Sequence, residues 1–416
     1  MAWESDTGAA GWRRGVAVCA LAQLLSVMGF SCATAFLPLY VQTLGVASPD
    51  TAAVWAGVML FASAFAVALC SPFWGTVADR YGAKLMVERA MFGGAAVIGA
   101  MSLVHHAEHL LVLFVIQGFF TGINTAIATL VSGLAPRARL GAALGLCQTA
   151  VFVGSSVGPL LGGLLADAYS YRVGIASGAG LLLLGGLCVL LGAREPARAP
   201  APAGARPGLL TGLRPALSSR PLLLVIALIF LVQFSTQMIG PVLPVFVQEL
   251  VGPDGRVATL AGLALAAGGV AAALSAVALG RVADRLGHHR ILAWATLGGA
   301  LATAPQALVG AFAPFVALRA AAGLFAGGLT TSTSAAIGLL TTPGRRGAAF
   351  GVAGSAFSLG NALGPLLGGL LTAAAGPRAP FAAAAAALAL GWLVVRALAG
   401  VQAPESRPAV GAGGNP

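Results

Sequence analysis

The stretch Gly75-Thr76-Val77-Ala78-Asp79-Arg80-Tyr81-Gly82-Ala83-Lys84 is a charged, glycine-punctuated break between two long apolar runs. Gly280-Arg281-Val282-Ala283-Asp284-Arg285-Leu286-Gly287 repeats its pattern, G-x-V-A-D-R-x-G, 205 positions later. A pattern that recurs at a long, fixed offset indicates an internally duplicated architecture. The sequence therefore predicts two similar halves, each containing one copy of this break.

The composition of the chain places it in a lipid bilayer. It has 416 residues, of which 58% are hydrophobic and 8% charged, whereas soluble domains average about 45–50% apolar and about 25% charged residues. Apolar runs near the roughly 20 residues that cross a bilayer occur about twelve times. We therefore expect an all-α membrane protein with twelve transmembrane helices in two pseudo-symmetric six-helix bundles. The predicted spans begin near Gly15, Thr51, Leu85, His109, Gly141, Arg172, Pro221, Ala258, Ile291, Phe312, Gly347 and Ala379.

Two further pairs of sequence blocks relate the halves. LPLYVQ at 37–42 matches LPVFVQ at 243–248, and GPLLGGLL at 158–165 recurs at 364–371, both at an offset of 206. Between the halves lies a polar, Pro-rich segment with the composition of a linker. The predicted parts are an N-terminal segment (1–14), a first bundle (15–193), a linker (194–220), a second bundle (221–400) and a disordered C-terminal tail (401–416).

The distribution of positive charge predicts the orientation in the membrane. The net charge is +11, but the Lys and Arg residues lie singly or in small groups between apolar runs, so we expect no nucleic-acid surface. If the N-terminus is cytoplasmic, 19 of the 23 basic residues fall on the inner side and 3 on the outer side. Because cytoplasmic loops are enriched in Lys and Arg, we expect a multi-pass protein of the cell inner (cytoplasmic) membrane with both termini in the cytoplasm.

The residues of the charged break suggest a tight turn between two helices that also places a carboxylate near the membrane surface. Gly75 and Gly82 permit the close approach and unusual backbone angles of a tight reversal between two helices. The carboxylate of Asp79, near the membrane surface, would be satisfied by a helix N-terminus or by Arg80 or Arg89. The alternative is a charged turn that only sets topology. Topology alone does not require this residue order, so its duplication favours a further role.

On these residues the chain resembles the major facilitator superfamily, whose loop between helices 2 and 3 has the form G-x-x-A-D-R-x-G-x-K. The resemblance covers nearly the whole sequence, and it implies two six-helix halves latched on the cytoplasmic side by a charge network around Asp79. Ala83 stands where a basic residue is common, so the basic end of the motif rests on Lys84. The residues to which this gating role is assigned are Gly75, Asp79, Arg80, Gly82, Lys84, Arg89, Gly280, Asp284 and Arg285.

A glycine pattern in the fifth span is the second motif. Gly154, Gly158 and Gly162 recur every four residues, so they share one helix face and let another helix approach to backbone contact. Pro159 removes a backbone donor and can bend the helix. A packing seam is the simplest interpretation, but G-x-x-x-G-P-x-x-G-G also resembles the family's antiporter motif, which implies export. The motif residues are Gly154, Gly158, Pro159, Gly162 and Gly163, with a second copy at Gly360, Gly364, Pro365 and Gly368.

Polar residues within the spans are candidates for a substrate cavity. Arg at the centre of an apolar helix costs about 2.5–3.5 kcal/mol on insertion scales, so Arg319 should face the bundle interior or water; a structural Arg bonded to helix carbonyls is the alternative. Arg319 lies four residues before Gly323, as an Arg does before a Gly in the family's fourth helix, but the first half has Phe114 there. The candidates, on helices that line the cavity in this family, are Gln23, Gln117, Asn124, Gln233, Gln237, Arg319 and Thr331.

The similarity to the proton-coupled drug exporters of this superfamily implies secondary active export of small organic compounds or drugs in exchange for protons, by alternating access. We expect a monomer whose partners are its substrate, protons and the lipid bilayer. No carboxylate lies near the centre of a span, so the candidates for proton coupling are Glu88, Asp167 and Glu249, near span ends. The alternatives are a major facilitator importer or exporter of a sugar or other metabolite, and a membrane receptor or scaffold without transport.

The sequence HHAEH at 105–109 has the H-x-x-E-H spacing of some metalloproteases. A catalytic metal also needs a third ligand and a supporting scaffold, so we expect no metal site here. No nucleophile and base pair falls within the spans, and the sequence has no phosphate-binding P-loop. We therefore expect no enzyme, no cofactor and no ATP-driven step.

Overall fold

The structure is a computed structural model that describes residues 6–193, 219–253, 255–341 and 346–402. All regular elements within these residues are helices. The first half contains α1 (Asp6–Thr34), α2 (Leu37–Thr43), α3 (Pro49–Tyr81), α4 (Ala83–Met101), α5 (Ala107–Phe120), α6 (Ile123–Leu134), η1 (Arg137–Arg139), α7 (Leu140–Ala168) and α8 (Tyr171–Gly192). The second half contains α10 (Arg220–Met238), α11 (Leu243–Val251), α12 (Val257–Leu286), α13 (His288–Thr303), η2 (Ala304–Leu308), α14 (Phe312–Leu340), α15 (Arg346–Ala375) and α16 (Ala379–Gln402).

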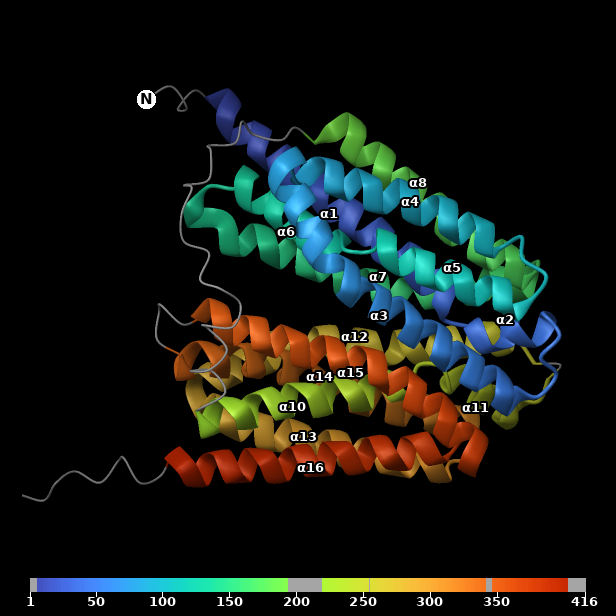
Figure 1. Ribbon diagram of the computed structural model, residues 1–416. Coiled ribbons are helices and arrows are strands. Elements are labelled where there is room, and N and C mark those ends of the chain that lie inside the picture. The colour runs from blue at the N-terminus through green and yellow to red at the C-terminus, as the bar shows by residue number, and fades with distance from the viewer. Residues whose placement is uncertain (1–5, 194–218, 254, 342–345, 403–416) are drawn as a thin grey trace, which may run out of the picture.

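The two halves form two helical bundles that lie side by side (Figure 1). α1 begins and α16 ends at one end of the molecule, called the termini end here, and the short helices α2 and α11 lie at the opposite end, called the far end (Figure 1). The bundles meet where α3 contacts α15 and where α7 contacts α12. Inside the first half α1 packs on α7 and α8, as α10 packs on α15 and α16 in the second half. The duplicated sequence thus folds into two related bundles.

Eleven helical stretches of the described chain are long and apolar enough to cross a membrane. The remaining long helix, α4, has 19 residues but carries Lys84, Glu88 and Arg89 near its start. It packs against α8, α5 and α6 as the third long helix of the first half. The predicted all-α membrane architecture is confirmed. The predicted linker, up to residue 218, and the predicted tail, beyond residue 402, lie outside the described residues.

The turn that joins α3 to α4 is shorter than the sequence predicted. α3 stays helical through Gly75 as far as Tyr81, and the chain reverses at Gly82, whose φ is 99°. In the second half α12 ends at Leu286, and the turn is at Gly287, with a φ of 90°. One residue in the left-handed region, which favours glycine, is enough to end a helix and start the next. The expectation that Gly75 takes part in the turn is therefore wrong, because Gly75 lies inside a helix.

The fourth span is also different from the prediction. The apolar run after His109 is divided into α5 and α6, and the residue before α6, Gly122, has a φ of 130°. The corresponding helix of the second half, α14, is continuous over 29 residues. The first half therefore contains a broken helix where the second half has an unbroken one.

Candidate functional site

The charged motif lies at the termini end. Arg80 and its counterpart Arg285, each in the last turn of a helix, are exposed. Lys84 Nζ lies 3.5 Å from Glu88 Oε1 on the next turn of α4, and it also donates to the Leu190 carbonyl of α8 at 3.1 Å. The side-chain surroundings of four predicted gating residues, Gly75, Asp79, Gly280 and Asp284, lie outside the described part of the structure, so the latch around Asp79 stays a prediction.

Arg89 lies at the break between α5 and α6. Its guanidinium carbon is 3.5 Å from the centroid of the Trp74 ring, and its Nη2 donates to the Phe120 carbonyl at 3.3 Å. The Trp74 indole donates to the Phe119 carbonyl at 2.7 Å. These donors reach the last carbonyls of α5, which have no partner within their own helix. We call Trp74 and Arg89 the clamp of the broken helix. The sequence did not single out Trp74, because its partner carbonyl is 45 residues away.

The break positions two of the predicted cavity residues. Asn124 is the second residue of α6, and its Oδ1 accepts a hydrogen bond of 2.6 Å from Gln23 Nε2 on α1. Gln23 is 2% exposed, whereas Asn124 is exposed. Gln117, in the last turn of α5, is buried, and its Oε1 has no hydrogen-bond partner among the described residues. Carboxamides from α1, α5 and α6 therefore lie on both sides of the break.

A second group of carboxamides joins α10 to α15. Asn361 Oδ1 accepts hydrogen bonds from Gln237 Nε2 at 2.5 Å and from Gln233 Nε2 at 3.3 Å. Glycines bring the two helices close, because a Cβ added at Gly360 would lie 2.9 Å from the Phe230 carbonyl oxygen of α10. We call Gln233, Gln237 and Asn361 the amide triad. Asn361 was missing from the predicted cavity set, although an amide inside an apolar helix beside Gly360 was a usable signal.

Arg319 lies two turns into α14 and is partly buried. A Cβ added at Gly268 of α12 would lie 3.4 Å from the Arg319 carbonyl oxygen and 3.7 Å from its Nη2, so the side chain runs along α12. Its Nε is buried without a hydrogen-bond partner, and within the described residues no carboxylate pairs with it. The side-chain surroundings of Thr331, further along α14, lie outside the described part of the structure.

The glycines of the antiporter motif line two faces of α7. Added Cβ atoms at Gly158 and Gly162 would lie 2.7 Å and 2.8 Å from the carbonyl oxygens of Met28 and Cys32 on α1. Gly154 faces the same helix, at Leu24. The neighbouring Gly163 instead faces Ala258 of α12, and the Pro159 carbonyl faces Gly262, both across the boundary between the halves. The second copy behaves in the same way: Gly360, Gly364 and Gly368 face α10, while Pro365 faces Gly57 of α3.

Polar contacts hold the halves together at the far end. Gln42 and Gln248, the last residues of the repeated LPxxVQ block, exchange hydrogen bonds of 3.1 Å and 3.3 Å between their carboxamides. Asp167 Oδ2 accepts a 2.7 Å hydrogen bond from the Thr259 backbone N–H in the first turn of α12. A carboxylate at a helix N-terminus is favoured by the unpaired N–H groups and by the helix dipole.

Glu249 makes its contact within the second half. Its Oε1 lies 3.0 Å from Arg378 Nη2, and the two side chains are 40% and 44% exposed. An exposed ion pair of this kind contributes about 0–1 kcal/mol. Of the three acids proposed for proton coupling, Asp167 and Glu249 therefore lie at the far end, and only Glu88 lies toward the termini end.

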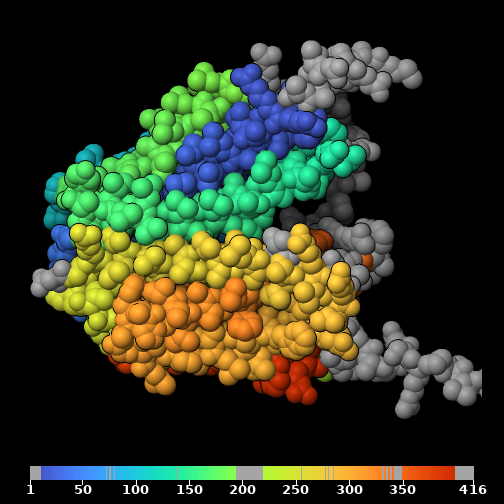
Figure 2. Space-filling view, turned by 180° about the vertical axis from the view of Figure 1, so that it is seen from behind, coloured from blue at the N-terminus to red at the C-terminus, as the bar shows by residue number. Residues whose placement is uncertain are grey.

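Contacts between the halves weaken toward the termini end. Gly163 on α7 and Gly369 on α15 lie against the opposite half, but Cβ atoms added at Gly145 and Gly351, nearer the termini end of the same helices, would meet no atom within 4 Å. The same holds for Gly141 and Gly354. Figure 2 shows the first half (blue to green) and the second half (yellow to red) in continuous contact toward the far end and parted toward the termini end.

Comparison with known proteins identifies the family. Residues 19–312 and 228–415 match the Major Facilitator Superfamily. The chain belongs to the major facilitator superfamily. It is 34% identical over 377 residues to "Multidrug resistance protein MdtG" of Serratia proteamaculans (strain 568), covering 89% of this chain and 90% of that protein. It is 32% identical over 383 residues to the protein of the same name from Escherichia coli (strain K12 / DH10B), covering 91% of this chain and 92% of that protein.

Solved structures agree with the major facilitator fold. A bacterial homologue of the human lysosomal transporter Spinster, in an inward-facing and unoccupied conformation, has a TM-score of 0.79 at 16% identity and covers 94% of this chain and 98% of its own. A mutant of the nucleoside transporter NupG has a TM-score of 0.76 at 15% identity and covers 92% of this chain and 99% of its own. Because the family match and the relatives place it in the major facilitator superfamily, the protein is a transporter and not an enzyme.

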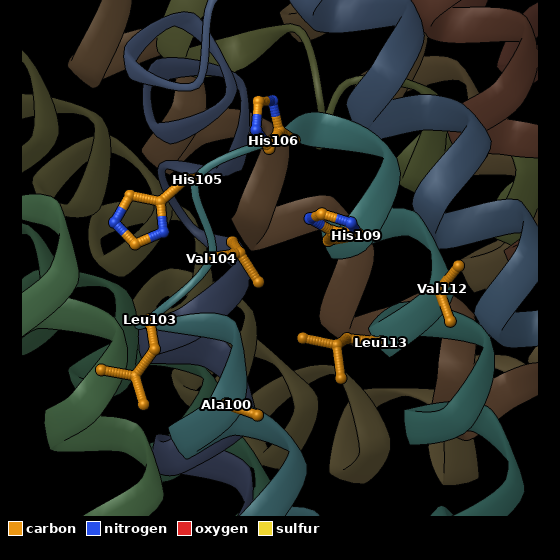
Figure 3. Close-up of a pocket in the computed structure, with 8 residues that line it drawn as sticks. All are labelled: Ala100, Leu103, Val104, His105, His106, His109, Val112 and Leu113. Carbon is orange, nitrogen blue, oxygen red and sulfur yellow. The ribbon is translucent and has the colours of Figure 1, made fainter.

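One cluster of this major facilitator protein lies apart from the contacts described above. His105, His106 and His109 line an otherwise apolar groove of about 660 Å³ between the end of α4 and the start of α5 (Figure 3). The rings of His106 and His109 are 5.4 Å apart. In the described part of the chain no group of three or more His, Cys, Asp or Glu residues is placed to hold a metal ion.

Proposed function

We propose that this transporter exports small organic compounds or drugs across the cytoplasmic membrane in exchange for protons, with both termini in the cytoplasm. The names of its relatives refer to multidrug resistance. The doubled antiporter motif and the excess of Lys and Arg in the loops at the termini end support the direction and the orientation.

The observation that carries the proposal is the unequal closure of the two ends. Hydrogen bonds join Gln42 to Gln248 and Asp167 to Thr259 at the far end, while Gly145 and Gly351 face open space toward the termini end. Alternating access needs a state in which one end is sealed and the other is open. With cytoplasmic termini, this is the inward-facing state of a monomer whose two bundles, 15–193 and 221–400, rock about their shared boundary.

The charged motif has the complementary role in this scheme. When the far end opens, the termini end must close, and the motif around Asp79 and Asp284 then latches the halves on the cytoplasmic side. Gly82 keeps the turn short, and Arg80 and Arg285 are exposed in the last turns of α3 and α12. We expect Asp79→Ala to slow the conformational cycle more than it lowers stability.

The polar residues between the bundles form the substrate site in this proposal. Gln23 and Asn124 serve from the first half, and Gln233, Gln237 and Arg319 from the second. Because Arg319 lacks a paired carboxylate in the described structure, the site favours neutral or anionic compounds over dications.

Proton coupling is assigned to Glu88. Glu88 Oε1 is buried and lies 3.5 Å from Lys84 at the end that faces the cytoplasm in this orientation. Asp167 and Glu249 make contacts that hold the far end in place. Substitution of Glu88 by Gln should therefore uncouple transport from the proton gradient, whereas substitution of Asp167 by Asn should weaken closure.

Everted membrane vesicles test the direction and the coupling together. Vesicles containing the protein should accumulate substrate when acidified inside, and a protonophore should abolish the accumulation. Vesicles with Glu88→Gln should lose the dependence on the gradient but keep downhill flux. Uptake by whole cells without accumulation in everted vesicles would establish an importer instead. If wild-type protein moves nothing under a proton gradient, and substitutions at Glu88, Asp167 and Glu249 change nothing, proton antiport is wrong.

A cross-link at the far end tests alternating access. Gln42→Cys and Gln248→Cys, in a background carrying Cys70→Ser and Cys188→Ser, should be joined by a short bis-maleimide because the native carboxamides touch. The joined protein should bind substrate from the termini side and stop transporting. Each single cysteine variant, treated in the same way, is the control and should keep transport. Full transport by the cross-linked protein would show that the far end does not open.

A further inference from the structure

The amide triad presents unused hydrogen-bonding groups. Asn361 Oδ1 accepts from both glutamines, which leaves the whole NH2 group of Asn361, one N–H bond on each glutamine and the Oε1 atoms of Gln233 and Gln237. Asn361 Nδ2 and the two Oε1 atoms have no hydrogen-bond partner in the described structure, and none of them is fully buried, unlike Gln117 Oε1. The triad therefore carries donors and acceptors that reach accessible space.

That space is the region between the halves. Gln233, Gln237 and Asn361 are all partly exposed although they lie within apolar helices. Exposure of three carboxamides to hydrocarbon would leave polar groups unsatisfied at a cost of several kcal/mol (~2–7). α15, which carries Asn361, forms part of the boundary with α3 of the first half. The free groups therefore face the boundary between the bundles and not the lipid.

The triad belongs to the second half alone. At the 206 offset Gln233, Gln237 and Asn361 correspond to Val27, Ser31 and Ser155. Ser155 Oγ donates to the Phe152 carbonyl of its own helix and contacts no second helix through a hydrogen bond among the described residues. The first copy of the glycine motif is thus a packing seam, whereas the second copy carries a polar group as well.

Resting on the export function proposed above, we propose that the amide triad selects compounds that carry an uncharged carboxamide-type group, such as an amide, lactam or urea. Asn361 Nδ2 donates to the carbonyl oxygen of the compound, and the Oε1 atoms of Gln233 and Gln237 accept its N–H bonds. This recognition uses both the carbonyl acceptor and the N–H donors of the compound. An ester or a fully alkylated amide has no N–H, so it can only accept the hydrogen bond from Asn361. Asn361 is the specificity-determining residue, because its oxygen positions both glutamines and its entire NH2 group is left for the compound.

The test is equilibrium binding of tritiated biphenyl-4-carboxamide to the purified full-length protein in nanodiscs, with N,N-dimethylbiphenyl-4-carboxamide as competitor. The wild type should prefer the primary amide by about tenfold or more, because the N,N-dimethyl compound has lost both N–H donors that the two Oε1 atoms accept. Asn361→Leu and Gln233→Met should each reduce the preference to about twofold or less. Ser155→Ala, the matched change in the first half, should keep the wild-type preference.

The outcomes separate this inference from the export function. An unchanged preference in Asn361→Leu, or a wild type that binds both compounds equally or binds neither, would overturn the assignment. The melting temperature shows whether Asn361→Leu folds. If it does not, the amide preference of Gln233→Met decides the question, because that variant keeps the hydrogen bond between Gln237 and Asn361. Binding needs no gradient, so a protein that selects the amide but transports nothing in vesicles would contradict the export function while supporting the site.

Discussion

The fourth long helix of the first half and its counterpart in the second half have matching glycines but different backbones. Gly118 and Gly122 correspond to Gly323 and Gly327 at the 205 offset. The chain breaks at Gly122 with a φ of 130°, whereas α14 continues through Gly327. Glycine therefore permits the break but does not cause it.

The difference lies in the side chains around the two helices. Trp74 and Arg89 donate to the carbonyls at the break, and their counterparts at the same offset are Leu279 and Trp294. Leu279 has no donor, and Trp294 is 58% exposed. Leu279 and Trp294, at the sequence positions that correspond to the clamp, line an apolar groove of about 430 Å³. A helix can break inside a membrane only where partners satisfy the freed carbonyls.

The largest effect is expected from converting the first half to the second at the clamp. The double variant Trp74→Leu and Arg89→Trp removes both donors, and each unsatisfied carbonyl costs about 1–3 kcal/mol. The lost stacking of Arg89 on Trp74 adds about 2 kcal/mol when desolvated. We expect a clear fall in melting temperature of the purified protein and at least tenfold slower export. Leu274→Ala, at a 67% exposed position, is the control. Wild-type melting and transport in the double variant would show that the break does not depend on the clamp.

Gly122→Ala should have the next largest effect. At a positive φ an L-residue costs about 1–2 kcal/mol, so the variant should be less stable. The matched control is Gly133→Ala in α6, where an added Cβ meets no atom within 4 Å and helix propensity favours Ala by about 0.5–1 kcal/mol. The two melting temperatures should shift in opposite directions. A Gly122→Ala variant as stable as Gly133→Ala would mean that Gly122 does not hold the positive φ of the break.

Trp74→Phe separates the hydrogen bond from the ring. Phe keeps the aromatic surface under Arg89 but loses the indole N–H that reaches the Phe119 carbonyl at 2.7 Å. The expected loss is about 1 kcal/mol by chemical or thermal unfolding. The control is Trp294→Phe in the second half. Among the described residues the Trp294 indole makes no hydrogen bond, so the stability of this variant should stay within about 0.5 kcal/mol of the wild type. Equal losses at the two positions would remove the distinction between them.

The smallest effect is expected from Leu279→Phe. The groove beside Leu279 has room for the extra carbons, so stability should change by less than about 0.5 kcal/mol. Leu228→Phe, at a position 1% exposed in the packed core of the second half, should cost about 1–3 kcal/mol through overpacking. Similar melting temperatures for the two variants would mean that the groove is filled in the folded protein.

The sequence predicted what depends on repetition and composition. The offsets of 205 and 206 indicated the paired bundles, and apolar runs indicated the spans. The same patterns could not distinguish Gly122 from Gly327, because the difference is made by Trp74 and Arg89 on other helices. Contacts between distant segments, such as Asp167 with Thr259, depend on how the helices cross and have no signal in local sequence.

Among the candidate site residues, some were predicted from the local sequence and one was missed. Gln23, Asn124, Gln233 and Gln237 stood out because amides are rare in apolar runs, and the structure pairs each of them with another amide. Asn361 had the same property but stood inside a glycine motif whose packing role accounted for its neighbours. A polar residue within a packing motif needs an explanation separate from that of the motif.

Gln42 and Gln248 are equivalent positions of the two halves within one chain. Their contact resembles the one that a residue makes with its own copy on the twofold axis of a symmetric homodimer. Such a meeting restricts chemistry, since two carboxylates or two ammonium groups would repel each other there. A carboxamide offers a donor and an acceptor in one group, so it complements itself. The two positions are encoded by separate codons, so either one can mutate alone. A change at one position nevertheless removes the hydrogen-bond partner of the other. These two codons are therefore expected to change together or not at all.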